Sequence, residues 1–163
     1  MQKNLPNFEQ IKNYERIAKK NGTDIQFKDL LGNWRFQYVW KKGKDRIDNL
    51  STTLLQVLSA NLELSESKIK KDESKYIIKN SIRIGLISFI FIGNAFLKGK
   101  RPLLSFYFEN FYFKVGNLTL IKRAINKIDS EKMPFFSLIA IDNNQKWLVA
   151  RGKGGGLAVW IID

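Results

Sequence analysis

The chain of 163 residues contains neither cysteine nor histidine. The lack of cysteine excludes disulfides, thiolate nucleophiles and cysteine-based zinc sites. The lack of histidine excludes a Ser-His-Asp triad, an imidazole acid or base and nearly all zinc arrangements. Few soluble enzymes work without either residue. The composition therefore favours a binding protein over an enzyme, and we expect no catalytic residue, no metal site and no cofactor.

Long apolar runs are also missing. The more apolar of the two longest uncharged stretches, residues 84–97, is interrupted by Gly85 and Gly93 and is shorter than the roughly 20 apolar residues that a spanning helix needs. Its isoleucine and phenylalanine content favours a buried strand. Residues 1–30 carry charges throughout and lack the apolar core of a signal peptide. We therefore expect a cytoplasmic protein or one at the periphery of a membrane.

Acidic residues are few relative to basic ones: 15 Asp and Glu stand against 28 Lys and Arg, which gives a formal net charge of +13. A surface with this charge attracts nucleic acid, anionic lipid headgroups or an acidic partner. The lysines are scattered along the chain, so a solvated surface without a specific partner explains the charge equally well.

Residues 7–21 predict an amphipathic helix, with Asn7 as its N-cap and Asn21-Gly22 as its end. Apolar residues recur at spacings of three and four: Phe8, Ile11, Tyr14, Ile17 and Ala18. The opposite face carries charged residues: Glu9, Lys12, Glu15, Arg16 and Lys19. We expect this helix to flank or plug a sheet.

After Gly32 the spacing between apolar residues changes from three or four positions to two. Trp34, Phe36, Tyr38 and Trp40 then fall on one face of a predicted strand. Further strands are predicted at Thr53–Ser59, Asn61–Ile69, Lys75–Ile84, Leu86–Leu97, Leu103–Glu109, Phe111–Val115, Leu118–Lys122, Phe135–Asp142, Lys146–Arg151 and Leu157–Ile162. Many short strands with hairpin-length breaks predict an all-β fold, an antiparallel barrel or sandwich. We expect one barrel over residues 27–163, preceded by the helix and lead-in of residues 1–26.

Aromatic residues at alternate positions give this sheet an aromatic face. The candidates for lining its interior are Phe36, Tyr38, Phe89, Phe91, Phe106, Phe108, Phe111, Phe113 and Phe136. A small barrel is either filled by such side chains or holds one small ligand. The alternation does not distinguish a packed core from an apolar cavity.

The segment from Gly152 to Gly156 is rich in glycine and suggests a phosphate-binding loop. It lacks the Lys-Ser/Thr ending of such loops, and a strand-like run follows it. A hairpin turn that needs positive φ explains the glycines better. Gly154, Gly155 and Gly156 are therefore predicted to have a structural role.

Two other functions remain open from the residues alone. A single-stranded nucleic-acid binder would expose aromatic platforms such as Phe106 and Phe108 beside basic grooves, but their apolar neighbours favour burial. An assembly protein would have a solid barrel and an apolar patch on its outside. Neither the partner nor the oligomeric state follows from the sequence.

Gly32-Asn33-Trp34 at the start of the first strand, combined with Arg151 near the last strands, resembles the lipocalin-like (calycin) pattern. The resemblance implies that the Arg151 guanidinium lies across the Trp34 indole and closes the barrel. Longer stretches resemble the fibrillin (plastid lipid-associated protein) family of cyanobacteria and plastids. They are residues 30–38, 102–108, 133–141 and 147–160, and the similarity extends over about residues 27–163.

The resemblance to fibrillins implies a lipocalin-like barrel that binds or carries a fatty acid, quinone, carotenoid or related pigment at a thylakoid-type membrane. In this interpretation Gly32, Trp34 and Arg151 are framework residues and the inward aromatic residues line the cavity. The chain shows no Ser-rich transit peptide, so a cyanobacterial-type member is expected. Phycobiliprotein lyases share this barrel class and are a further relative to consider. The expected partners are a small lipophilic ligand and an anionic membrane surface.

Overall fold

The protein is described by a computed structural model that covers residues 4–48, 61–66, 76–126, 129–144 and 146–162. Within these ranges the chain forms helices α1 (Phe8–Asn21) and α2 (Phe27–Leu30) and a 3-10 turn at Ser130–Lys132. The strands are β1 (Gly32–Trp40), β2 (Asn61–Glu66), β3 (Tyr76–Ile84), β4 (Ile87–Lys98), β5 (Leu103–Val115), β6 (Leu118–Ala124), β7 (Phe135–Asp142), β8 (Trp147–Gly152) and β9 (Leu157–Ile162). The prediction of an all-β fold with an N-terminal helix is confirmed.

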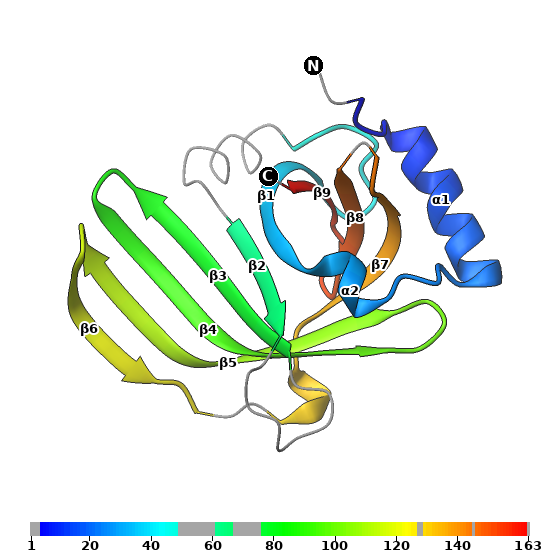
Figure 1. The fold of residues 1–163 in the computed structure, drawn as a ribbon. Coiled ribbons are helices and arrows are strands. Elements are labelled where there is room, and N and C mark those ends of the chain that lie inside the picture. The colour runs from blue at the N-terminus through cyan, green and yellow to red at the C-terminus, as the bar shows by residue number, and fades with distance from the viewer. Residues whose placement is uncertain (1–3, 49–60, 67–75, 127–128, 145, 163) are drawn as a thin grey trace.

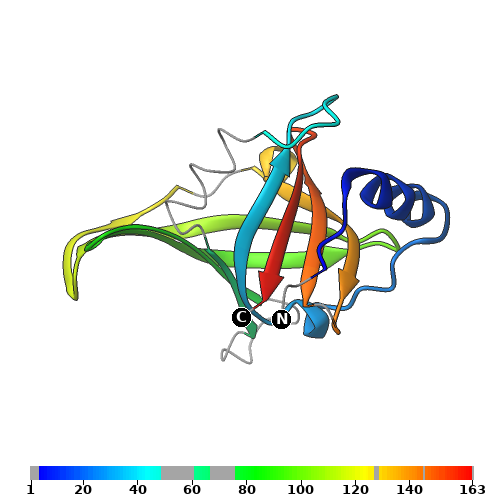
Figure 2. The same ribbon diagram turned by 90° about the horizontal axis from the view of Figure 1, so that it is seen from above.

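All strands pair antiparallel in one sheet with the order β4-β3-β2-β1-β9-β8-β7-β5-β6. An additional pairing of β4 with β5 joins the sheet to itself, so that every strand except β6 belongs to a closed ring (Figure 1). Helix α1 lies outside this ring against β7 (Figure 2). Among the described residues, no helix has the length and apolar character required to cross a bilayer.

Strand β5 is longer than the sequence analysis predicts, because it runs without a break through Asn110. Its first residues, Leu103 to Ser105, pair with β7, and its last residues, Asn110 to Val115, pair with β6. Strand β4 accompanies β5 along its whole length. The outer halves of β3, β4 and β5 together with β6 therefore project beyond the ring, on the side opposite α1 (Figures 1 and 2). We call residues 80–91 and 110–124 the two-hairpin extension.

The predicted boundaries of α1 are confirmed. The Asn7 side chain accepts a hydrogen bond from the Gln10 backbone N–H at 2.9 Å, and the Gln10 side chain accepts one from the Asn7 backbone N–H, which forms a capping box. Gly22 ends the helix with a φ of 85° and donates its N–H to the Ala18 carbonyl. The helical period places Ile11 and Ala18 in the core as expected, whereas Ile17 is exposed and Glu15 is buried.

Buried apolar residues form two clusters, one on each face of the sheet. The inner cluster includes residues from every strand of the ring and from α2: Phe27, Leu30, Trp34, Phe36, Leu62, Leu64, Ile78, Ala95, Leu104, Phe106, Leu138, Leu148, Ala150 and Trp160. The outer cluster lies between α1 and the sheet: Ile11, Trp40, Ile139, Trp147, Val149, Leu157, Val159 and Ile161. The ring therefore has a core inside and a second core beneath α1.

The prediction that Trp34, Phe36, Tyr38 and Trp40 share one face is wrong. Strand β1 shifts its register against β9 between Phe36 and Tyr38. One extra residue in a strand reverses the alternation of side chains beyond it. Trp34 and Phe36 consequently belong to the inner cluster, whereas Tyr38 and Trp40 pack in the outer cluster under α1.

Within the described residues, the remaining predicted strands agree with the structure apart from small shifts at their ends, except that the strands predicted at 103–109 and 111–115 are one strand. Residues 67–69 of the strand predicted at 61–69 lie outside the described residues. The strand predicted at 53–59 lies outside the described residues. The breaks predicted between the strands at Gly85 and Gly116 are turns in the structure, where the two glycines have φ of 57° and 56°.

Candidate functional site

The interior of the ring contains an apolar cavity of about 330 Å³. Its lining comes from β1, β2, β3, β5, β7, β8 and β9: Phe36, Val39, Asn61, Leu62, Asn80, Phe106, Phe108, Phe136, Gly152, Gly156, Ala158 and Trp160. Helix α2 contributes Phe27 and Leu30 to the inner cluster around Trp34, which fills the other part of the interior. The ring is thus partly packed and partly hollow, which combines the two outcomes that the sequence left open.

Aromatic rings continue from the cavity onto the two-hairpin extension. Ring centroids lie 5.4 Å apart for Phe136 and Trp160, 5.3 Å for Phe106 and Phe136, and 5.6 Å for Phe106 and Phe108. Beyond the cavity the neighbouring pairs are Phe91–Phe108 at 5.5 Å, Phe91–Phe111 at 5.0 Å, Phe89–Phe111 at 6.5 Å and Phe89–Phe113 at 5.4 Å. These spacings are those of interacting aromatic pairs. We call this continuous row of rings, from Trp160 to Phe113, the aromatic row.

The structure therefore divides the predicted cavity-lining residues into three groups. Phe36, Phe106, Phe108 and Phe136 line the cavity. The others on β4 and β5 belong to the aromatic row outside it: Phe89, Phe91, Phe111 and Phe113. Tyr38 does not line the cavity, because the irregularity in β1 turns it to the outer face.

The sequence analysis missed Trp160 as a cavity-lining residue. Its position two residues after Ala158 in a strand-like run places both on one face, and that alternation was the available signal. Trp160 contacts Phe36 edge-on, with 6.4 Å between centroids and an interplanar angle of 84°. The Trp160 side chain thus lies between those of Phe36 on β1 and Phe136 on β7.

Two asparagines border the cavity, Asn61 on β2 and Asn80 on β3. Asn80 pairs with Leu62 of the inner cluster, so its amide faces the interior, whereas Asn61 pairs with Arg35 and its side chain lies on the outer face. Among the described residues, the lining contains no carboxylate, lysine or arginine.

A larger hollow of about 570 Å³ lies on the outer surface beside the start of α1. It is bordered by exposed polar residues such as Asn4, Asn7 and Asp45 as well as by Tyr38 and Trp40. Polar residues make up much of its border, whereas the lining of the cavity in the ring is mainly apolar and includes the aromatic residues Phe36, Phe106, Phe108, Phe136 and Trp160. The inner cavity therefore has the character of ligand sites, which are lined mainly by apolar side chains and carry few polar groups.

Arg151 does not lie against Trp34 as the lipocalin-like pattern implies. Alternation along β8 places Leu148 and Ala150 in the inner cluster and Val149 in the outer one, so Arg151 points to the outer face. Trp34 belongs to the inner cluster, and its indole N–H donates to the Leu30 carbonyl at 2.7 Å. The two residues are on opposite faces of the sheet, and each has a structural role with another partner.

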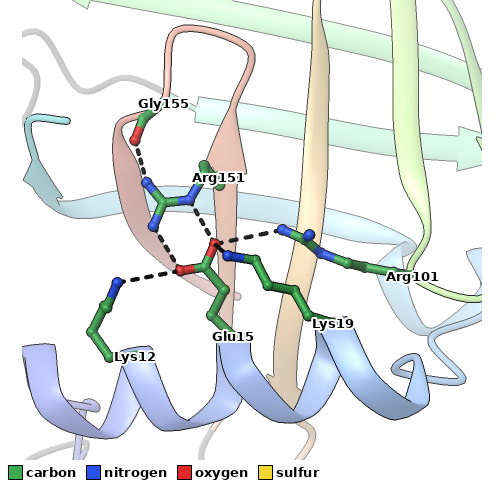
Figure 3. A network of polar contacts seen from close by, with 6 residues as sticks. All are labelled: Lys12, Glu15, Lys19, Arg101, Arg151 and Gly155. Carbon is green, nitrogen blue, oxygen red and sulfur yellow. Dashed lines mark hydrogen bonds and ion pairs between the residues drawn. The ribbon is translucent and has the colours of Figure 1, made fainter. Parts of the chain in front are cut away.

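The partner of Arg151 is Glu15 of α1, whose side chain is almost fully buried. Arg151 donates from Nε to Oε1 and from Nη2 to Oε2, both at 2.7 Å, in a bidentate pair (Figure 3). Arg101 Nη2 lies 3.5 Å from Oε1, Lys19 Nζ 3.6 Å from Oε1 and Lys12 Nζ 3.9 Å from Oε2. This Glu15 cluster joins α1 to β8 and to the turn between β4 and β5.

Sequence reasoning placed Glu15 on the solvated face of the helix, and the structure corrects this. The hydrogen bonds from Arg151 hold the pKa of Glu15 below its usual value of 4.5, although burial opposes that shift. Lys19 and Lys12 lower the pKa further through their charge. The cluster has the character of a structural anchor, because its carboxylate is surrounded by cations and lines none of the hollows described among residues 4–48, 61–66, 76–126, 129–144 and 146–162.

The low pKa of Glu15 predicts acid sensitivity that depends on this residue. Glu15 binds its proton more weakly in the folded state than in the unfolded state. The ionised Glu15 side chain therefore contributes its full stabilisation above about pH 4.5, and this stabilisation is lost as the pH falls through the pKa of the folded state. We expect Glu15→Gln to be less stable than the parent chain near pH 7, with the difference shrinking below about pH 4.5. Thermal unfolding of both proteins between about pH 3 and pH 7 measures this difference in stability. A difference that stayed constant with pH would contradict this role.

The glycine-rich turn between β8 and β9 is a hairpin turn, as predicted. The Gly152 N–H donates to the Gly156 carbonyl at 2.9 Å, and Gly155 has a φ of 86°. The Gly155 carbonyl accepts a hydrogen bond from Arg151. The Lys153 N–H donates to the Phe135 carbonyl at 3.0 Å. The N–H groups of Gly152, Lys153 and Gly155 therefore bond within the protein and are not available to hold a phosphate.

The described residues contain no cluster of acidic side chains suited to a metal ion. Comparison of the chain with family models, with curated proteins and with solved structures yields no match. The resemblance to fibrillins and lipocalins therefore stays a prediction from the sequence, and the argument for function rests on the geometry of the ring.

Proposed function

We propose that the protein binds a small apolar molecule in the cavity of the ring and catalyses no reaction on it. The observation that carries this proposal is a hollow of about 330 Å³ bounded by Phe36, Phe106, Phe136 and Trp160. Protein interiors normally fill such space. Removal of apolar ligand surface from water yields about 25 cal/mol per Å², so few polar contacts are needed.

The size of the cavity constrains the ligand. Ligand sites usually measure about 300–1,000 Å³, and this cavity lies at the lower end. A compact ring system fits inside. A longer molecule, such as a fatty acid, an isoprenoid quinone or a carotenoid, would place one end in the cavity and extend along Phe108 and Phe91 of the aromatic row.

The finer proposal is a lipocalin-like protein of fibrillin type that carries such a ligand near a photosynthetic membrane. Its support is the sequence similarity at residues 30–38 and 147–160 and a closed antiparallel ring preceded by a helix. Nucleic-acid binding is less favoured, because Phe106 and Phe108, the expected stacking platform, line the cavity instead of facing solvent.

Filling the cavity tests the proposal. Ala158 lines it, and Ala158→Phe adds a ring there, whereas Ala124→Phe adds the same ring at an exposed site on β6. With a fluorescent fatty acid as the probe, we expect the parent chain and Ala124→Phe to bind alike and Ala158→Phe to bind at least about 10-fold more weakly, since a lost contact of about 1.4 kcal/mol gives that factor. Circular dichroism and melting curves confirm folding.

A second measurement covers the case in which Ala158→Phe fails to fold. Phe106→Leu removes a ring from the lining, and we expect it to change the probe's affinity and its emission maximum. Mass spectrometry of organic extracts of the purified parent chain should find a bound lipophile. A parent chain that bound no probe and retained no lipophile would overturn the proposal.

A further inference from the structure

The end of the two-hairpin extension exposes large apolar side chains. Leu86 is 73% exposed, Leu118 is 64% exposed and Ile84 is 48% exposed. Leu86 lies in the β3–β4 turn, and Leu118 begins β6 directly after the β5–β6 turn. The Gly116 N–H donates to the Leu86 carbonyl at 2.7 Å, which joins the two turns. Turns usually carry polar residues or glycine, so the leucine in the β3–β4 turn is unusual. Apolar side chains grouped on the surface in this way mark an interaction site.

Strand register extends this apolar end across four strands. Ile84 pairs with Ile87, Ile87 with Val115, and Val115 with Leu118. Directly paired residues point to the same face of a sheet. The row formed by these four residues, together with Leu86, is called the apolar tip. Strands are spaced about 4.8 Å apart, so the tip is roughly 14 Å wide.

Basic residues lie directly behind the apolar tip. The next row across the sheet on the opposite face contains Arg83, Ser88 and Lys114, which pair in that order. Strand β6 adds Lys122, which pairs with Tyr112 on that face and lies 5.8 Å from its ring centroid. The sequence has no aspartate or glutamate in residues 76–98 or 110–124. An apolar end backed by cations without acidic residues is complementary to an anionic surface with an apolar interior.

We propose that the apolar tip inserts into the headgroup region of an anionic lipid bilayer, with the basic residues behind it contacting lipid phosphates. Leu86 and Leu118 would enter the boundary between headgroups and acyl chains, where apolar side chains leave water. Arg83, Lys114 and Lys122 would then remain at the charged surface, within a Debye length of it. The extension points away from α1, so the ring does not obstruct this approach (Figure 2).

The main alternative occupant is a second copy of the chain paired along β6, which has β5 as its neighbour and an outer edge. Such a pair would join two chains of net charge +13 along strands that carry Lys122 and Arg123, and like charges repel. It would also leave Leu86 and Ile84 uncovered at the turns, because edge pairing covers strands and not their ends. Charge and position therefore favour the bilayer.

Docking does not require a ligand in the ring, so it stands apart from the proposed function. The aromatic row does connect the two regions, because Phe89 and Phe113 pair directly next to the apolar tip and Phe108 lines the cavity. A lipophile taken from the bilayer would meet apolar surface over the whole distance to the cavity.

Vesicle co-sedimentation tests the docking. The parent chain is expected to bind vesicles of phosphatidylcholine mixed with phosphatidylglycerol at least about 10-fold more tightly than vesicles of phosphatidylcholine alone. Leu86→Ser/Leu118→Ser should lose at least about 10-fold in affinity for the anionic vesicles. Leu103→Ser, at an exposed position on β5 outside the extension, is the matched control and should bind like the parent chain. Arg83→Gln/Lys122→Gln should weaken the preference for anionic vesicles.

The outcomes separate the possibilities. A parent chain that did not bind the anionic vesicles, or a tip variant that bound them as tightly as the parent, would overturn the proposal. A concentration-dependent dimer in sedimentation velocity that Leu86→Ser/Leu118→Ser abolished would assign the tip to a second copy instead. The tip variant should still bind the fluorescent fatty acid in the absence of vesicles, and Ala158→Phe should still bind vesicles, so the two proposals can fail independently.

Discussion

Replacing Glu15 by alanine is expected to lower the free energy of unfolding by about 3 kcal/mol, because it removes the carboxylate that neutralises Arg151 and Arg101 beneath α1. Removing one member of a buried ion pair leaves the other charge desolvated without compensation. Arg151 would keep only its bond to the Gly155 carbonyl among the contacts described for its guanidinium. For a chain of this size the change corresponds to a decrease of roughly 6 to 12 °C in melting temperature.

Glu9→Ala is the matched control, since Glu9 lies on the same helix and is exposed. We expect it to cost less than about 1 kcal/mol, the loss of one acidic group from the first turn of the helix. Urea denaturation of the parent and both variants measures the difference. Equal destabilisation by Glu15→Ala and Glu9→Ala would show that the Glu15 cluster does not anchor α1.

A double variant separates an uncompensated charge from lost packing. Glu15→Leu/Arg151→Met replaces the ion pair with apolar side chains, and such replacements are often neutral in buried sites. We expect it to recover part of the stability that Glu15→Ala loses, because the Arg151 charge is removed and Lys12 and Lys19 are exposed enough to remain solvated. The recovery is incomplete because Arg101 still lacks its carboxylate.

The sequence predicts the strands well because the breaks between them have their own chemistry. Gly85, Gly116 and the glycines after Arg151 each stand at a chain reversal, and the helix ends at Gly22 because its φ is positive. These are local effects, so a single sequence shows them. The continuity of β5 through Asn110 was not predictable, because its two halves pair with different strands, β7 and β6, and both partners come later in the chain.

The faces of the strands were harder to predict than their positions. An alternating pattern specifies two faces but does not show where an extra residue reverses them. In β1 the irregularity next to Gln37 moves Tyr38 to the outer face, and in β7 the one between Leu138 and Ala140 places Ala140 against the outer cluster beside Ile139. Tyr38 remains in an apolar environment after the reversal, so the hydrophobic pattern gives no sign of it.

The burial of Glu15 could not be predicted either, because it depends on a partner that is distant in the sequence. Its helical position is correct in the sequence analysis, but its partner Arg151 is separated from it by 136 residues. Only the tertiary fold brings β8 under α1 and makes the buried carboxylate tolerable. Arg151 was recognised as a structural residue, and its actual partner is an acidic group on the helix that the family resemblance does not include.

The sequence predicted part of the cavity lining but not the empty space. Phe36, Phe106, Phe108 and Phe136 were identified from alternation. What the sequence could not show is that the rings leave space between them, because packing depends on rotamers and on the curvature of the sheet. The aromatic row arises in part from the pairing of β4 with β5, which places Phe91 opposite Phe111 and Phe89 opposite Phe113.

That pairing depends on Gly93, and Gly93→Ala is expected to lower the free energy of unfolding by about 3 kcal/mol, the upper part of the range for overpacking. A Cβ at this position would lie 2.6 Å from the Phe108 Cα and would also clash with the Tyr107 carbonyl oxygen. Both obstacles are backbone atoms of β5, so no rotamer change relieves them. Strands β4 and β5 would have to separate where their pairing closes the ring.

Gly154→Ala is the control, because no atom lies within 4 Å of its added Cβ and its φ is not positive. It should be neutral or stabilise the protein by less than about 1 kcal/mol, through the lower entropy of the unfolded chain. Since Phe108 both meets the Gly93 Cβ and lines the cavity, Gly93→Ala should also weaken binding of the fluorescent fatty acid. Chemical denaturation and probe titration of both variants measure the two effects. Normal stability with normal binding in Gly93→Ala would mean that β4 and β5 do not approach as closely as the ring requires.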